Sequence, residues 1–188
     1  MNARAARTDG FRPRGERRRR RGRVLVLGVG NPLLGDDGIG AAAIHRLRQE
    51  PLPRGVEVFD AGTSTIDVLA DLARFERVIV IDAVRAAGAV PGTVVEFDLA
   101  TAEVEGAGPA FSAHEFELGG LKALAAALGV KLPPVHVVGL VPVEVELGQG
   151  LSPAGMAALG PIVERVLRLV RAGPGPGAGR PASQPRPA

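Results

Sequence analysis

The chain has 188 residues, of which 46% are hydrophobic, enough for one domain with a real core. It contains no cysteine, which excludes disulfides, thiolate metal ligands and a cysteine nucleophile. The only aromatic residues are six phenylalanines. The core must therefore be built from Val, Leu, Ile and Ala, a composition typical of buried parallel strands covered by helices.

The positive charge of the chain is concentrated at its two ends. Residues 1–23 carry ten Arg against two acids, and residues 171–188 carry three Arg and no acid, whereas residues 24–170 have a net charge of −8. Blocks of like charge are usually disordered, and no aromatic-rich nucleic-acid motif accompanies them. We therefore expect no nucleic-acid partner, and three zones: a disordered Arg-rich head (1–22), a folded domain (23–170) and a disordered Pro/Gly tail (171–188).

No export or membrane segment is evident. The run Arg17–Arg21 before Val24–Leu27 looks like a twin-arginine signal, but its apolar stretch is too short and no cleavage site follows. No apolar run approaches the roughly 18 residues needed to span a bilayer. The expectation is a cytoplasmic protein without a membrane partner.

The predicted elements alternate along the domain. Short, mostly apolar runs predict strands over Arg23–Leu27, Glu57–Phe59, Arg77–Ile81, Thr93–Leu99 and Val135–Val141. The intervening segments predict helices over Asp37–Gln49, Thr65–Phe75 and His114–Leu128. A final helix begins at Ser152-Pro153, a cap followed by proline at the first helical position. Pro161 should kink or restart that helix.

The connection between the third and fourth strands sets the sheet type. Residues 83–92 are ten in number and include two Gly and one Pro, which is short for a crossover helix. The fourth strand is therefore expected to run antiparallel. The predicted fold is a three-layer α/β/α sandwich with a mixed five-stranded sheet, of the phosphorylase/hydrolase-like kind.

Acidic residues follow three of the predicted parallel strands. Asp36 and Asp37 follow the first, Asp60 ends the second and Asp82 ends the third. Open α/β sheets bind ligands outside the carboxyl ends of their strands, and close carboxylates repel unless a cation or proton lies among them. Alternatively Asp37 caps the first helix, and Asp60 forms an Asx turn, which is an equally good account of that residue.

The glycine-rich loop Gly28–Gly40 does not fit a nucleotide site. The dinucleotide fingerprint requires a third glycine where Leu33 stands, Pro32 interrupts the phosphate-binding turn, and no Walker lysine is present. Asp36 and Asp37 would also repel a pyrophosphate at the start of the helix. The loop therefore favours a metal or a peptide ligand.

Three histidines remain as candidate ligands. His45 lies in the first helix beside arginines and is best explained as solvated, and His136 begins the fifth strand, where a hydrogen-bonded structural role is commoner. His114 follows a flexible Gly/Pro stretch at the start of a helix and is the better candidate. Two carboxylates and an imidazole could hold iron, zinc, nickel or manganese.

A serine hydrolase is a weaker alternative. Ser64, Ser112 and Ser152 all lack the G-x-S-x-G elbow of that class. Ser112 and His114 are only two residues apart, which by itself does not indicate a catalytic triad.

Taken together, these segments resemble the hydrogenase maturation protease family. The matching signatures occur in the family's order and spacing and cover nearly all of residues 23–170: Gly28–Gly40, Asp60-Ala-Gly-Thr, Ile81-Asp82-Ala, Ser112-Ala-His114, and Val138–Pro142 to Gly150-Leu-Ser-Pro153. The resemblance implies a mixed sheet with the fifth strand between the third and the fourth. It also implies nickel contact, and catalysis, by Asp37, Asp82 and His114.

The resemblance further implies an endopeptidase that removes the C-terminal peptide from the nickel-loaded precursor of a nickel–iron hydrogenase large subunit. The precursor supplies the nickel, and the enzyme is expected to be a monomer. Two features depart from the family pattern: position 37 is often Glu, and the Arg-rich head has no counterpart. Two alternatives belong to other functional classes. The first is a nickel-binding chaperone that uses the same three ligands but does not cleave. The second is a flavodoxin-like nucleotide module, which the glycine pattern disfavours.

Overall fold

The computed structural model describes residues 22–64, 68, 71–85, 88–100, 129, 131–148 and 150–172. Its centre is a five-stranded sheet formed by β1 (Val24–Val29), β2 (Val56–Gly62), β3 (Arg77–Ala83), β4 (Val94–Asp98) and β5 (Val135–Leu140). The order across the sheet is β2-β1-β3-β5-β4. The strand order and the mixed fold that the sequence predicted are therefore confirmed.

The direction of each strand follows from its neighbours. β1 pairs in parallel with β2 and β3, and β3 pairs in parallel with β5. β4 runs antiparallel to β5, with Val94 opposite Leu140. The short connection between β3 and β4 was thus a correct indication of the sheet's one antiparallel pairing among the described strands.

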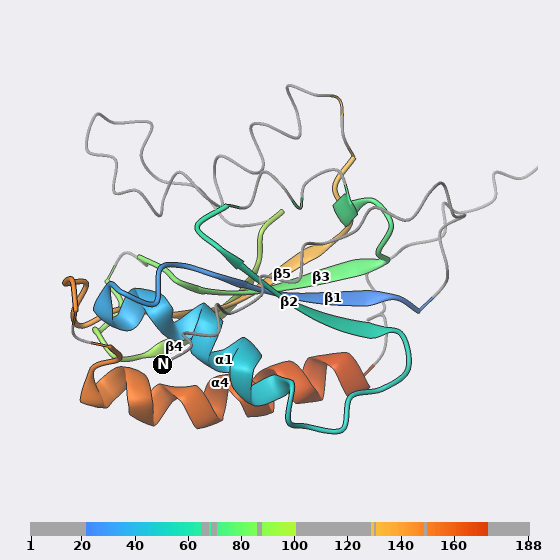
Figure 1. The fold of residues 1–188 in the computed structure, drawn as a ribbon. Helices are drawn as coiled ribbons and strands as arrows, with labels where there is room; N and C mark the ends of the chain where they lie inside the picture. The colour runs from blue at the N-terminus through green and yellow to red at the C-terminus, as the bar shows by residue number, and fades with distance from the viewer. Residues whose placement is uncertain are drawn as a thin grey trace, which may run out of the picture.

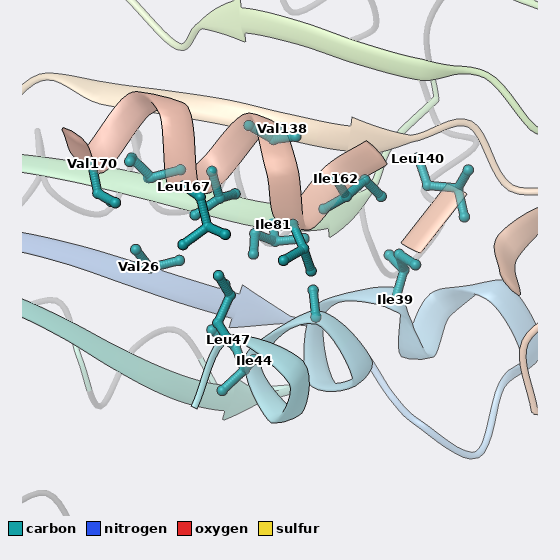
Figure 2. Close-up of a cluster of buried hydrophobic side chains, with 14 of the residues drawn as sticks. Val26, Ile39, Ile44, Leu47, Ile81, Val138, Leu140, Ile162, Leu167 and Val170 are labelled. Carbon is teal, nitrogen blue, oxygen red and sulfur yellow. The ribbon is translucent and has the colours of Figure 1, made fainter. Parts of the chain in front are cut away.

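Two helices cover one face of the sheet. The turn η1 (Gly35–Gly38) leads directly into α1 (Ile39–Leu47), and α4 (Pro153–Arg171) lies beside α1 on the same face (Figure 1). Figure 2 shows the apolar side chains that these helices and the sheet bury between them, including Val26, Ile44, Ile81 and Ile162. The alternation of side chains along each strand places Leu25, Leu27, Val78 and Val80 on the opposite face.

The second face has its own apolar core. Val68, Leu72 and Phe75, which lie between β2 and β3 in the chain, pack there against side chains of β1, β3 and β5. The chain thus crosses from β2 to β3 over the face opposite α1, as expected for an α/β/α sandwich. Residues 65–67, 69 and 70 of the helix predicted over Thr65–Phe75 lie outside the described residues. All of the helix predicted over His114–Leu128 lies outside them as well.

Helix α4 begins as predicted but does not restart at Pro161. The Ser152 side chain accepts a hydrogen bond from the Gly155 N–H (3.0 Å), and Pro153 occupies the first helical position. The helix continues through Pro161 as one element. The residue before a proline normally resists helical geometry because its Cβ meets the proline ring. Here that residue is Gly160, which has no Cβ, and buried Ile162, Val163 and Val166 hold the following turns on the core.

Residues 1–21 and 173–188 lie outside the described residues, so the predicted head and tail stay predictions. Among the helices that the structure describes, none has the length and apolar character required to cross a bilayer.

Candidate functional site

The candidate site lies at the carboxyl ends of the parallel strands. The chain leaves β1 toward β2 on one side and leaves β3 toward β4 on the other, so the order of the strands reverses between β1 and β3. Ligand crevices of open α/β sheets form at such a reversal. The turn η1, which carries Asp36 and Asp37, follows β1 and lies against β3. Two of the acidic segments identified in the sequence therefore lie beside each other at this end of the sheet.

Asp82 lies near the end of β3 and is almost completely buried, with 1% of its surface exposed. In the sheet Asp82 pairs with Gly139 of β5. The preceding residue, Ile81, pairs with Gly28 of β1. Alternation along the strand places Asp82 on the face of Val78 and Val80, opposite α1 and α4. Burying a carboxylate in an apolar strand costs free energy unless hydrogen bonds or an opposite charge compensate it.

Asp37 is fully buried in η1. Its Oδ2 accepts a hydrogen bond from the Asn31 N–H at 2.6 Å. The interpretation of Asp37 as a helix cap is wrong, because the N-cap of α1 is Gly38 and no side chain caps that helix. The carboxylate is held by the preceding loop instead.

Two glycines allow this loop to fold so tightly. Gly30 has a φ of 118°, and a Cβ at that position would lie 2.0 Å from the Asp37 backbone oxygen. A Cβ at Gly40 would lie 2.2 Å from the oxygen of Val29 and 2.8 Å from that of Ile81. The glycines of this loop therefore bring the start of α1 onto the ends of β1 and β3, rather than making room for a phosphate.

Asp36 has a different role from its neighbour. One of its carboxylate oxygens, Oδ2, accepts hydrogen bonds from the Val143 N–H (2.9 Å), the Glu144 N–H (3.4 Å) and the Ser152 hydroxyl (2.9 Å). The other, Oδ1, accepts from the Ser152 N–H (2.8 Å). The Asp36 N–H in turn donates to the Glu144 carbonyl at 2.9 Å. Asp36 thus joins three segments: η1, the loop after β5 and the start of α4.

These contacts also set the charge state of Asp36. Burial raises the pKa of its carboxyl, but the hydrogen bonds from Val143, Ser152 and Glu144 together outweigh burial and hold the pKa below its ordinary value. The group therefore stays ionised in the folded protein at neutral pH. Because every one of these donors belongs to the protein's own frame, we assign Asp36 to structure rather than to ligand binding.

The lowered pKa predicts a loss of stability in acid. A carboxyl with a depressed folded pKa contributes its full stabilisation above its unfolded pKa, about 3.9, and loses it as the pH falls through the folded pKa. We expect the free energy of unfolding to fall below about pH 4, and to fall less in the Asp36→Asn variant. Urea unfolding at pH 7, 5, 4 and 3 measures this. Parallel pH curves for the two proteins would contradict the assignment.

Asp60 lies at the same end of the sheet but on its surface. It is exposed near the end of β2, level with Gly28, and its Oδ1 accepts the Gly62 N–H at 3.0 Å. This is the Asx turn that was one of the two alternatives for this residue. A turn-forming role therefore accounts for Asp60 without a ligand.

The two described histidines are accounted for by their surroundings. His45 is exposed on α1, and its Nε2 lies 3.3 Å from the Gln49 amide nitrogen. His136 lies between two carboxylates of β4, with Nδ1 2.7 Å from Asp98 and Nε2 2.9 Å from Glu96. Both observations agree with the structural roles predicted for them.

His114 and Ser112 lie outside the described residues. Within the described part of the chain, no group of three His, Asp or Glu side chains is arranged to hold a metal ion. A complete site would therefore need a third ligand, for which His114 stays the prediction. Ser152, considered above as a nucleophile, instead caps α4 and donates its hydroxyl to Asp36.

The role of Asp36 is the feature that sequence reasoning missed. Asp36 and Asp37 are adjacent and of one type, so nothing local separates them. The signal that could have helped is Ser152, whose capping role was predicted, but the partnership of residues 36 and 152 spans 116 positions. Only the packing of α4 against α1 brings the two together.

The chain is similar to known proteins of one family. The family model described as hydrogenase maturation protease matches residues 41–169. The chain is 34% identical over 155 residues to the hydrogenase 2 maturation protease of Escherichia coli, covering 79% of this chain and 91% of that protein.

Two solved structures are similar across nearly their whole length. The hydrogenase maturating endopeptidase HybD from E. coli gives a TM-score of 0.68 at 32% identity, covering 80% of this chain and 93% of that one. The NiFe hydrogenase maturation protease HybD from Thermococcus kodakarensis gives 0.61 at 32% identity, covering 79% and 99%. The fold, the matched residues and these relatives agree: the chain belongs to the hydrogenase maturation protease family and is an endopeptidase of hydrogenase maturation.

Proposed function

We propose that this protein removes the C-terminal peptide from the nickel-loaded precursor of a nickel–iron hydrogenase large subunit, and that it recognises the precursor by the nickel that the precursor carries. Asp37, Asp82 and His114 would contact that nickel. The observation that carries the proposal is the burial of Asp37 and Asp82 at the carboxyl ends of β1 and β3, where η1 lies against β3.

The donor set is suited to a metal that arrives with its substrate. Two carboxylates and one imidazole, without a thiolate, make a modest nickel site with open coordination positions. Cysteine thiolates of the precursor would be the stronger ligands, and this chain has no cysteine with which to compete for the metal. Nickel should therefore bind the complex of the two proteins much more tightly than it binds this protein alone.

The proposed chemistry follows from the groups that meet at the carboxyl ends of the strands, which are the nickel of the substrate and the buried carboxylates. The nickel of the substrate can polarise the scissile carbonyl or lower the pKa of a water molecule. A buried carboxylate can instead act as the base while the metal only positions the peptide. In both cases Asp37 and Asp82 would lie beside the reacting peptide bond at the end of the sheet. Asp36 keeps the Asp37 turn in place through the loop after β5.

The proposal predicts that cleavage requires nickel in the precursor. We expect the purified protein to release the C-terminal peptide from nickel-loaded precursor, and to process metal-free precursor at least ~100-fold more slowly, because the metal completes the binding site. Mass spectrometry of the released peptide measures both rates.

Two outcomes would contradict this mechanism in different ways. Equal cleavage of the loaded and metal-free forms would remove the requirement for nickel while leaving the protease intact. No cleavage of either form, together with tight nickel binding by the isolated protein, would indicate the chaperone that was considered from the sequence. Isothermal titration of nickel into the purified protein provides that second measurement.

A further inference from the structure

Four large apolar side chains lie exposed beside the candidate site. Leu33, from the loop after β1, is 61% exposed, and three residues after β5 follow it: Val143 at 48%, Val145 at 44% and Leu147 at 76%. We call these four residues the rim strip. Single exposed apolar residues are ordinary, whereas a group of them on adjoining segments marks an interaction surface.

The two segments of the rim strip are joined by their backbones. Leu34 forms an antiparallel bridge with Leu147, and the Gly148 N–H donates to the Leu33 carbonyl at 2.8 Å. Between Val143 and Leu147 the sequence alternates apolar and acidic residues, with Glu144 and Glu146 exposed as well. The segment that carries three of the four residues of the rim strip thus also exposes two carboxylates.

The rim strip is also fixed to the turn that carries Asp37. The Asp36 carboxylate accepts the N–H groups of Val143 and Glu144, and the Asp36 N–H donates to the Glu144 carbonyl. Asp36 and Asp37 are neighbours in η1. A peptide bound along the strip would thus be held at a fixed place relative to Asp37.

The charge of the strip discriminates among its possible occupants. A second copy of this chain, packed symmetrically, would bring Glu144 and Glu146 toward the same carboxylates of its partner, which is repulsive. Residues 1–21 carry the complementary charge, but Met1 and Phe11 are their only large apolar residues, too few for four positions. The complementary occupant is a separate peptide with several apolar side chains and flanking Lys or Arg.

We propose that the rim strip docks the segment of the hydrogenase precursor that is to be cleaved, as a peptide with apolar side chains and flanking Lys or Arg. This inference rests on the proposed function, because it takes the precursor as the substrate. The apolar side chains of the peptide would cover Leu33 and Leu147, and its basic groups would face Glu144 and Glu146. The docking would determine which peptide bond reaches Asp37 and Asp82.

The test uses the full chain with both exposed leucines replaced, Leu33→Asp and Leu147→Asp. Loss of two apolar contacts should raise KM for nickel-loaded precursor ~10- to 100-fold, whereas kcat at saturation should change little. A fluorescent peptide that covers the precursor's C-terminal segment should lose affinity by the same factor in anisotropy titrations. The control is Met156→Asp, which places the same charge on an apolar residue that is 60% exposed but lies on α4, outside the strip.

The outcomes separate this inference from the proposed function. Cleavage by the wild-type protein with an unchanged KM in the double variant would overturn the docking surface and leave the protease standing. Peptide binding that is lost in the double variant, without cleavage by either protein, would support the surface and contradict the protease. The inference would be overturned if the wild-type protein bound no peptide. It would also be overturned if the wild-type protein formed a dimer in sedimentation experiments and the double variant did not.

Discussion

Asp37→Asn and Asp82→Asn are each expected to reduce processing of the nickel-loaded precursor at least ~100-fold, the lower end of what a positioned acid–base group contributes. Asparagine keeps the shape of aspartate, but it has no negative charge, is a poor nickel ligand and cannot accept a proton. Both side chains are buried at the carboxyl ends of the parallel strands, where water cannot substitute for them. Single-turnover cleavage followed by mass spectrometry measures the effect.

The protein should stay folded in both variants. Removal of one of two buried carboxylates at the same end of the sheet lowers the repulsion between like charges, so the free energy of unfolding should be unchanged or rise. His136→Ala is the control for activity, since its imidazole is paired with Asp98 and Glu96 of β4, away from the crevice. An inactive His136→Ala protein, or a fully active Asp82→Asn protein, would show that the site has been assigned to the wrong residues.

Asp36→Ala is expected to be the most destabilising of the acidic substitutions, at ~3–5 kcal/mol. It removes the acceptor of the Ser152 hydroxyl and of the N–H groups of Ser152 and Val143. Each buried donor left without an acceptor costs ~1–3 kcal/mol. The variant no longer has to bury a carboxylate, which offsets part of the total cost of the three donors. Against a typical total of ~5–15 kcal/mol, the variant should unfold at much lower urea concentration.

Asp60→Ala is the matched control for stability. Its carboxylate accepts one N–H group, that of Gly62, at an exposed position, so its removal should cost less than ~1 kcal/mol. Urea unfolding followed by circular dichroism compares the two variants. If Asp36→Ala costs no more than Asp60→Ala, then water or neighbouring groups satisfy the donors, and Asp36 does not join the three segments.

Local patterns in the sequence determined much of the sheet. Val24–Val29 and Arg77–Ala83 are strands because short apolar runs must be buried on both faces. The ten residues between β3 and β4 are too few for a crossover helix, and β4 is indeed antiparallel to β5. Ser152-Pro153 begins a helix because the Ser152 hydroxyl accepts a free N–H of the first turn, and because proline has no backbone N–H that would need an acceptor there.

Other features could not be predicted from local residues, and the order of the strands is the first. The position of β5 between β3 and β4 followed from the resemblance to a family, since pairing between Val78 and Val135 involves residues far apart in the chain. The continuity of α4 through Pro161 is a second case. There the missing Cβ of Gly160 and the burial of the next turns outweigh the tendency of proline to end a helix.

The acidic residues show most clearly which features the sequence determines and which only the tertiary structure determines. The sequence placed Asp36, Asp37, Asp60 and Asp82 at one end of the sheet, because the carboxyl ends of parallel strands lie together. Local residue patterns could not assign their separate roles, because a carboxylate's role depends on which donors surround it. Packing of α4 against α1 brings Ser152 and the loop after β5 to Asp36 and satisfies that charge. The tertiary structure therefore decides that Asp36 joins segments of the fold and that Asp60 forms a turn, whereas Asp37 and Asp82 lie buried at the carboxyl ends of the strands.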